Sequence, residues 1–214
     1  MQIIRKYIVV LCCCFSVSSY AQEAVALAHY VFPSFIKGKV QQKNGSVDEA
    51  MLNYNVLSKE IVFESKPGQY MALADPTKID TVFIQGQKFV PVNNEFYELL
   101  TTTAYPLFIQ YTCTIKEPGS DIGFGMTSVT TASPAVKSLI QSGGAYSLKL
   151  PDGFQVMMGS AFWIFKDSKY QKANSAKQLV AAIPDKKDKI NELVKKNNTN
   201  FAKRQDVIDL VQQL

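Results

Sequence analysis

Histidine is nearly absent from this chain of 214 residues, which limits the catalytic and metal-binding chemistry available to it. His29 is the one histidine, and no cysteine or pair of carboxylates stands beside it in the sequence to complete a metal site or a catalytic set. We therefore expect His29 to be a surface or lightly packed residue near a terminus, rather than a general base or a metal ligand.

A long apolar run is also absent. The N-terminal apolar stretch, residues 8–15, is shorter than the roughly 20 residues that a transmembrane helix needs. It follows a basic pair, Arg5 and Lys6, and precedes the small residues of a signal-peptidase site, so residues 1–21 have the pattern of a secretory signal peptide. We predict cleavage between Ala21 and Gln22, and hence an exported protein.

Cysteine is scarce once this signal peptide is removed, because Cys113 alone remains. An exported chain with one cysteine has no internal disulfide, so its stability must come from a hydrophobic core. Cys113 lies in an apolar strand pattern with no histidine or cation in view, and we expect it to pack as a small hydrophobe rather than to act as a nucleophile. Cys12 follows Leu11 instead of a small residue, which disfavours a lipoprotein.

An excess of charge of one sign is missing too. The predicted mature chain keeps 21 basic and 18 acidic residues, a net charge of +3 that is too small to indicate a nucleic-acid partner. The composition, 47% hydrophobic and 19% charged, is typical of a globular protein. The remaining 193 residues are enough for one domain with an appendage or for two small domains.

Strand and turn signals dominate the part of the chain that is left, above all residues 52–92. Turns at 66–69, 75–78 and 85–88 recur about every ten residues, the spacing of an antiparallel meander. Pro91 lacks a donor N–H, so we expect its strand to be an edge strand or to end there. The expected core residues of this stretch are Leu52, Tyr54, Ile61, Phe63, Leu73, Ile79, Val82, Ile84 and Phe89. Asn53 and Asn55 are expected to be hydrogen-bonding partners of strands or turns rather than ligand contacts.

The pattern changes to helix from residue 174 onward. Asn174 or Ser175 can cap a first helix that ends before Pro184, Asp185 can cap a second, and a third covers residues 203–214. The predicted fold is therefore α+β, an antiparallel β-meander (sandwich-like or curved) followed by a short helical segment. We divide the chain into a signal peptide at 1–21, a β-rich domain at 22–170 and a basic helical segment at 171–214.

Two segments of the β-rich domain attract functional interest. Residues 116–134 are rich in Gly, Ser, Thr and Pro, which predicts a long loop and a place for a partner contact. Residues 161–165, Ala-Phe-Trp-Ile-Phe, could stack on sugar rings, but a run that is apolar on both faces favours a buried strand. Between these segments, the Asp-Gly pair at 152–153 predicts a hairpin that joins residues 145–150 to 155–158.

Four short motifs, in order along the chain, are Leu52-Asn53-Tyr54-Asn55, Ile79-Asp80-Thr81-Val82, Phe89-Val90-Pro91 and Asp206-Val207-Ile208-Asp209-Leu210-Val211. Through them the chain resembles a group of uncharacterised secreted proteins of Bacteroidota-type Gram-negative bacteria. That group has no established activity, so the resemblance implies an envelope setting and neither a catalytic residue nor a cofactor. It also implies that Asp80-Thr81-Val82 matches an O-glycosylation acceptor pattern.

No assembled catalytic, cofactor-binding or metal-binding set is visible, and we favour an exported, non-catalytic envelope protein that binds a protein or a glycan. One alternative is an exported hydrolase whose carboxylates meet only in the fold, with Asp75, Asp80, Glu95 and Glu98 as candidates. Another is a peripheral membrane protein held by the basic helices, although acidic residues are interspersed among the basic ones. Two carboxylates in a deep pocket would favour the hydrolase, and a shallow sheet face with exposed aromatic side chains would favour binding.

Overall fold

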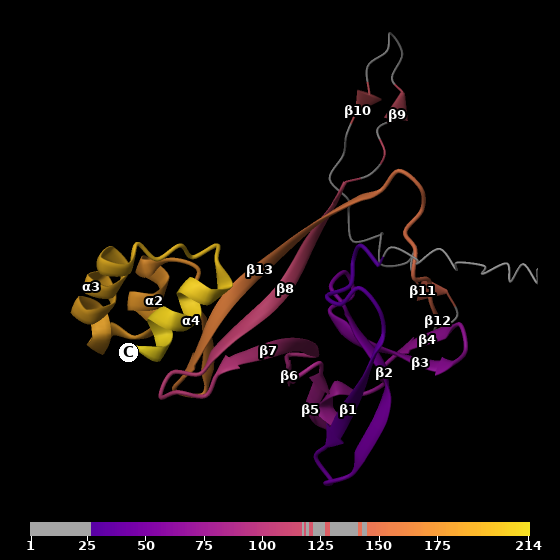
Figure 1. The fold of residues 1–214 in the computed structure, drawn as a ribbon, viewed down its shortest axis with the longest axis horizontal. Coiled ribbons are helices and arrows are strands. Elements are labelled where there is room, and N and C mark those ends of the chain that lie inside the picture. Colours follow the sequence, from indigo (N-terminus) through magenta and orange to yellow (C-terminus); the bar gives the residue numbers. More distant parts are fainter. Residues whose placement is uncertain (1–26, 117, 119, 122–126, 129–140, 143–144) are drawn as a thin grey trace, which may run out of the picture.

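The computed structural model describes residues 27–116, 118, 120–121, 127–128, 141–142 and 145–214 (Figure 1). The predicted signal peptide, with its cleavage site between Ala21 and Gln22, lies outside the described residues.

Ten antiparallel strands form the main sheet, in the order β14-β13-β8-β7-β6-β5-β1-β2-β3-β4. They are β1 (Ile36–Gln42), β2 (Val47–Asn55), β3 (Glu60–Lys66), β4 (Gln69–Ala72), β5 (Ile79–Ile84), β6 (Gln87–Val92), β7 (Glu95–Thr101), β8 (Leu107–Lys116), β13 (Gln155–Lys166) and β14 (Lys169–Lys172). Two-residue ladders join β9 (Ser120–Asp121) to β10 (Thr127–Ser128) and β11 (Gln141–Ser142) to β12 (Ala145–Tyr146). The helical elements are η1 (Pro76–Lys78), α2 (Ala176–Ala182), η2 (Pro184–Lys186), α3 (Lys187–Asn197) and α4 (Arg204–Gln212). The predicted α+β class, with an antiparallel sheet and C-terminal helices, is confirmed.

Short turns join neighbouring strands where the sequence indicates them. Gly45 has a φ of 89° and completes the β1–β2 turn, while the Asn44 side chain accepts a hydrogen bond of 2.9 Å from the Ser46 N–H. The β6–β7 turn consists of Asn93 and Asn94, whose φ angles of 49° and 65° suit a two-residue hairpin that follows the twist of the strands.

The sheet curves, and one core fills its concave side around β1–β7. Every residue that the pattern of 52–92 assigns to the core belongs to this cluster, with Leu52, Tyr54 and Ile61 fully buried. The segment before β1 lies along the end of β2: the Val31 N–H donates to the Tyr54 carbonyl at 3.0 Å, and Asn53 bonds to the backbone of Phe32. Asn53 therefore has the structural role expected of it.

The helices cover the other end of the same concave face (Figure 1). Phe162 and Ile164 of β13 point into the core that the helices close, together with Leu107 and Ile109 of β8. Ser175 caps α2 as predicted, accepting from the Gln178 N–H at 3.2 Å. Helix α3 has no side-chain cap, so the expected role of Asp185 is wrong: it lies in η2, where Lys166 and Tyr105 bind its carboxylate.

β6 is not an edge strand, because it lies between β5 and β7, but it does end one residue after Pro91, at Val92. The β5–β6 ladder covers Gln87 to Phe89 and stops before Pro91. Because Gln87 closes a two-residue turn, the N positions of Gln87, Phe89 and Pro91 all face β5. The missing N–H of Pro91 thus faces a point where the ladder has already ended, and no hydrogen bond is lost.

The hairpin expected across residues 151–153 is also wrong in its partners. Gly153 does occupy a turn, with a φ of 84°, but β12 pairs with β11, and β13 pairs along its length with β8. In the predicted loop 116–134, the described residues include the β9–β10 ladder, and the rest of the loop lies outside the described residues.

Candidate functional site: the aromatic face

Alternation along β13 places its aromatic residues on two different faces of the sheet. Phe162 is 2% exposed beneath the helices, whereas Trp163 and Phe165 lie half-buried on the opposite, convex face. The expectation of a buried strand therefore holds for Phe162 and Ile164 and not for their neighbours. We call the convex cluster the aromatic face; it comprises Tyr97, Phe108, Trp163, Phe165 and Tyr170.

Tyr170 of β14 is the centre of the aromatic face. Its ring centroid lies 4.8 Å from that of Phe165, 5.2 Å from that of Phe108 and 5.8 Å from that of Tyr97. The contacts with Phe108 and Tyr97 are edge-to-face, the arrangement that aromatic quadrupoles favour. Mutual packing of this kind buries Tyr97 and Phe108, at 5% and 6% exposed, and leaves part of Trp163, Phe165 and Tyr170 accessible.

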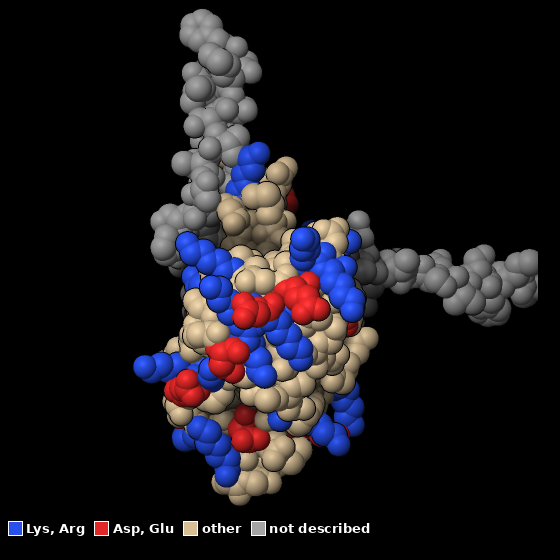
Figure 2. Space-filling view, turned by 90° about the vertical axis from the view of Figure 1, so that its left-hand side faces the viewer, with Lys and Arg blue, Asp and Glu red and all other residues tan. Residues whose placement is uncertain are grey.

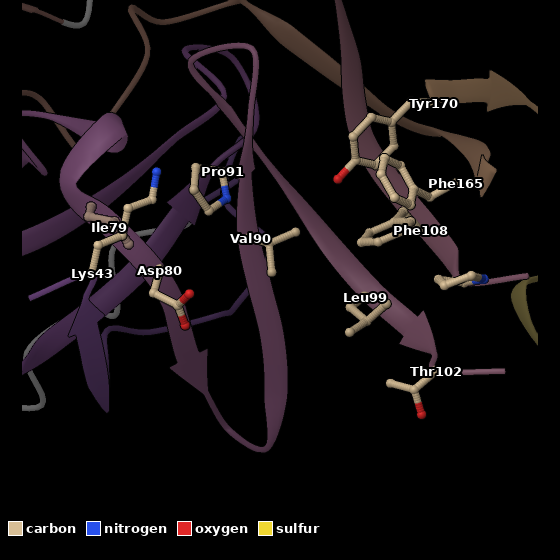
Figure 3. Close-up of a pocket in the computed structure, with 11 residues that line it drawn as sticks. Lys43, Ile79, Asp80, Val90, Pro91, Leu99, Thr102, Phe108, Phe165 and Tyr170 are labelled. Carbon is tan, nitrogen blue, oxygen red and sulfur yellow. The ribbon is translucent and has the colours of Figure 1, made fainter. Parts of the chain in front are cut away.

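A groove of about 420 Å³ runs beside these rings (Figure 3). Phe108, Phe165 and Tyr170 form one side of it, and Lys43 and Asp80 lie on the other. Between them the lining side chains are mostly uncharged: Ile79, Val90, Pro91, Leu99, Thr102 and Pro106. Val90 and Pro91 lie just beyond the end of the β5–β6 ladder. Among its lining residues the groove has a single carboxylate, that of Asp80.

A chain of polar side chains fixes the indole of Trp163. Its Nε1–H donates to Gln110 Oε1 at 3.2 Å, and Gln110 Nε2 donates in turn to Glu95 Oε2 at 2.5 Å. The other oxygen of Glu95 accepts from Lys59 Nζ at 2.7 Å, and Lys172 Nζ lies 5.6 Å from the indole centroid. These contacts hold the ring in one orientation and satisfy its only polar group.

The four candidate carboxylates do not converge on one site. Glu95 and Glu98 lie on opposite faces of β7, as the three-residue spacing in a strand requires. Asp75 caps η1 by accepting from the Thr77 N–H at 3.0 Å, and Asp80 accepts from the Thr81 hydroxyl at 2.9 Å on the rim of the groove.

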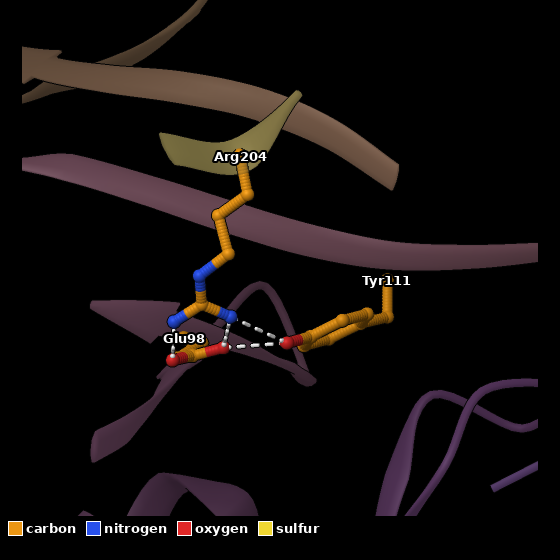
Figure 4. A network of polar contacts seen from close by, with 3 residues as sticks. All are labelled: Glu98, Tyr111 and Arg204. Carbon is orange, nitrogen blue, oxygen red and sulfur yellow. Dashed lines mark hydrogen bonds and ion pairs between the residues drawn. The ribbon is translucent and has the colours of Figure 1, made fainter. Parts of the chain in front are cut away.

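Glu98 is a structural anchor for α4 (Figure 4). Its carboxylate is 2% exposed and receives both terminal nitrogens of the Arg204 guanidinium, with Nη1 at 2.8 Å from Oε2. The Tyr111 hydroxyl donates to the same oxygen at 2.6 Å, and burial together with this carboxylate raises the pKa of Tyr111. Glu98 and Arg204 are separated by 106 residues, so no local signal in the sequence could have paired them.

A second cavity, of about 450 Å³, opens between β1, β2 and the segment from β4 to β5. Asp48, Glu49 and Asp75 lie among its lining residues. Hydrogen bonding and the charge of Lys37 lower the pKa of Glu49, and hydrogen bonds from Thr77 lower the pKa of Asp75. A general acid in a hydrolase needs a raised pKa, so these two carboxylates are poorly suited to that role.

His29 and Cys113 are both buried to some degree, which was expected for Cys113 and not for His29. His29 is 1% exposed, so the prediction of a surface or lightly packed residue is wrong. It is buried because the Val56 N–H donates to its carbonyl at 2.8 Å, which ties the segment before β1 against the end of β2. Cys113 packs against the concave core as expected, and burial raises the pKa of its thiol, which disfavours the reactive thiolate.

The outer surface of the helices carries charges of both signs. Figure 2 views this side of the molecule and shows Lys and Arg interspersed with Asp and Glu. Within the part of the chain that the structure describes, no helix has the length and apolar character needed to cross a membrane. Thr81, in the acceptor pattern that the resemblance implies, is 2% exposed within β5.

No protein family, curated protein or solved structure is detectably similar to this chain.

Alternation could have revealed part of the aromatic face from the sequence. In residues 161–165 the aromatic residues Trp163 and Phe165 alternate with Phe162 and Ile164, and this pattern means that the strand is apolar on both faces. What the sequence cannot show is that helices cover one face only. Phe108 lies on β8, which pairs with β13 across about 40 intervening residues, and Tyr97 lies on β7, the other neighbour of β8. No local pattern therefore brings these two residues to the same cluster as Trp163.

Proposed function

We propose that this protein is an exported, non-catalytic envelope protein that binds a glycan through the aromatic face and the groove beside it. The observation that carries the proposal is the cluster of five aromatic side chains on the one sheet face that the helices leave uncovered, of which Trp163, Phe165 and Tyr170 are partly exposed. Partly exposed apolar clusters of this kind are typical of interaction sites.

The chemistry of the groove favours a carbohydrate over a strongly charged partner. Its lining is largely apolar, with one acidic and one basic side chain, Asp80 and Lys43, at the side away from the rings. Half-exposed rings such as Trp163 and Tyr170 can stack against the C–H faces of sugars, and the nearby carboxylate and ammonium can hydrogen-bond to hydroxyl groups. Export and a Gram-negative envelope, both expected from the sequence, would place the protein among such polymers.

Binding is also better supported than hydrolysis. The groove contains Asp80 as its single carboxylate, whereas glycoside hydrolysis ordinarily uses two. Glu95 is engaged by Lys59 and Gln110, and Glu98 by Arg204 and Tyr111. A membrane-surface role has weaker support, since the helical surface mixes charges of both signs.

The test is a pull-down of envelope extract with the purified protein and two variants, Trp163→Ala and Tyr170→Ala. We expect each variant to retain less than about a tenth of the captured carbohydrate, a loss of about 1.4 kcal/mol or more in binding. Phe83→Ala is the matched control, because Phe83 is an aromatic residue of β5, 36% exposed, outside the aromatic face.

Two treatments of the extract identify the partner. A glycan survives protease digestion and loses binding after periodate oxidation of its vicinal diols, whereas a protein partner does the reverse. Capture that is abolished by protease, or that is unchanged in both aromatic variants, would overturn the proposal.

A further inference from the structure

Strand β13 is longer than the neighbour on its outer side, and this leaves an open edge. β14 pairs with β13 only from Trp163 to Lys166, whereas β8 pairs with it from Gln155 to Ile164. Among the residues that the structure describes, no strand pairs with the outer edge of residues 155–161. In Figure 1 this part of β13 extends with β8 beyond the helices as a two-stranded ribbon.

The orientation of the free backbone groups follows from the β13–β14 turn. Asp167 and Ser168 form a two-residue turn with φ angles of 51° and 59°, so the alternate residues counted back from Lys166 direct N–H and C=O toward the β14 side. Phe162 confirms this direction: its N–H donates to Asn174 Oδ1 at 2.6 Å and its carbonyl accepts from the Ala173 N–H at 2.8 Å.

Three further residues continue this series beyond the Asn174 contact: Ser160, Met158 and Val156. Each presents one N–H and one C=O to the open side. The segment Gln155–Ala161, Gln-Val-Met-Met-Gly-Ser-Ala, carries no charge and no proline. Soluble proteins usually protect such edges with charged residues, proline or a bulge. This edge has no charged residue and no proline to protect it.

From this geometry we propose that the edge pairs with the same edge of a second copy of the chain, antiparallel and about a two-fold axis at Met158. The three outward residues are symmetric about Met158, so in this register Met158 faces its counterpart and Val156 faces Ser160 of the other copy. All the free N–H and C=O groups are then paired. Gln155 lies opposite Ala161, so the paired stretch ends where Asn174 occupies the edge.

The side chains fit the same register. Met157 and Met158 are 57% and 46% exposed, among the most exposed large hydrophobic residues of the described chain. In the pair, Met157 of each copy lies over Gly159 of the other, and the two Met158 side chains meet on the opposite face. Each large residue therefore faces either a small one or its own equivalent, which is what an isologous interface requires.

This dimer would have a functional consequence that rests on the proposed function. A two-fold axis perpendicular to the sheet puts both aromatic faces on the same side, with their Trp163 residues about 34 Å apart along the strands, at roughly 3.4 Å per residue. A long glycan could then contact both copies at once and gain avidity. The dimer itself is independent of the glycan.

Sedimentation velocity of the purified protein at micromolar concentrations tests the proposal. We expect twice the monomer mass for the unchanged chain and the monomer mass for Met158→Lys. In the dimer the Cα atoms of the two introduced lysines would be about 5.5 Å apart, and their like charges would repel. The matched control is Val47→Lys, since Val47 is 55% exposed but opposite Gln41 inside the sheet. A monomeric unchanged chain, or a dimeric Met158→Lys variant, would overturn the proposal.

Charge reversal guards against a variant that is merely misfolded. Met158→Glu should also be monomeric, and mixing it with Met158→Lys should restore a species of dimer mass, because opposite charges then meet at the axis. Failure of the mixture to associate would contradict the register. Cysteine cross-linking at position 158 is unsuitable, because Cys113 is its partner on β8 within the same chain.

Discussion

The two faces of the sheet at β8 and β13 are made from the same strands but differ in how far their side chains are buried. On the concave face, Phe162 and Ile164 are almost completely buried by the helices. On the convex face, Trp163 and Phe165 keep part of their surface in water. Residues of similar size and hydrophobicity, adjacent in sequence, are thus buried on one side and leave a partly exposed surface on the other.

The difference comes from what covers each face rather than from the strand itself. A β-strand directs consecutive side chains to opposite faces whatever their type. Helices α2, α3 and α4 close the concave side, and among the described residues no helix packs on the convex side. The aromatic side chains there pack mainly on one another, through the central Tyr170 ring.

The concave face should give the largest effect on stability. Phe162→Ala removes a fully buried ring and leaves a cavity between β13 and the helices, so we expect a loss of about 3–5 kcal/mol in the free energy of unfolding. Urea denaturation followed by circular dichroism measures it. Phe165→Ala, on the convex face of the same strand, should reduce the free energy of unfolding by less than half as much. Equal losses for the two variants would contradict the comparison.

The anchor between Glu98 and Arg204 should give the next largest effect. Arg204→Met leaves the 2% exposed carboxylate of Glu98 without its cation, and we expect a loss of about 2–4 kcal/mol. The lower part of this range is expected because the Arg204 side chain is 40% exposed and water can partly replace it. Adding Glu98→Gln to Arg204→Met should recover part of the loss in the same denaturation experiment. A double variant less stable than Arg204→Met would contradict the assignment.

Local signals in the sequence were sufficient for the turns and for the concave core. Asn93-Asn94 specifies a two-residue turn because asparagine tolerates positive φ, and Gly86 gives the same signal for the turn at 85–86. Alternation identifies side chains such as Leu52 and Tyr54 as core. The helices at residues 176–212 were equally local, because Ser175 and Pro184 delimit the first of them.

Contacts over long sequence distances could not be predicted from such signals. About 40 residues separate β8 from β13, so the pairing that creates the aromatic face is not indicated by any local periodicity in the sequence. His29 was misplaced for the same reason, since its burial depends on a bridge between Tyr30 and Asn55. Pro91 indicated the end of β6, but it could not show that β6 lies between two strands, because that position depends on pairing with β5 and β7.

Acid should affect the stability of the fold and the aromatic face differently. Burial lowers the pKa of His29 to about 4, against 6.5 in the unfolded chain, so the unfolded state binds the extra proton between these values. The stabilisation is fully present above pH 6.5 and is lost as the pH falls toward 4, up to about 3 kcal/mol. Denaturation midpoints of the unchanged chain and of His29→Phe, compared from pH 7 to 4, measure how much of the loss of stability in acid comes from His29.

The aromatic face has no corresponding group. Burial raises the pKa of Tyr97 and of Tyr170, so these hydroxyls stay neutral through the same range. Capture of the glycan should therefore follow the folded fraction of the protein as the pH falls. A drop in capture while the protein remains folded would show that a titrating group contributes to binding.

The smallest effect on stability is expected from Gln110, and it offers the sharpest test of the comparison. Gln110→Ala removes the acceptor of the Trp163 N–H and one partner of Glu95, which should cost about 1 kcal/mol in denaturation. Freed from this contact, the half-buried indole can change orientation, and capture should fall by a larger factor than the stability change alone produces. Thr112→Ala, at the next position of β8 on the same face, is the control. If Gln110→Ala lowered stability and left capture unchanged, the orientation of Trp163 would serve packing, and the convex face would differ from the concave one in exposure but not in role.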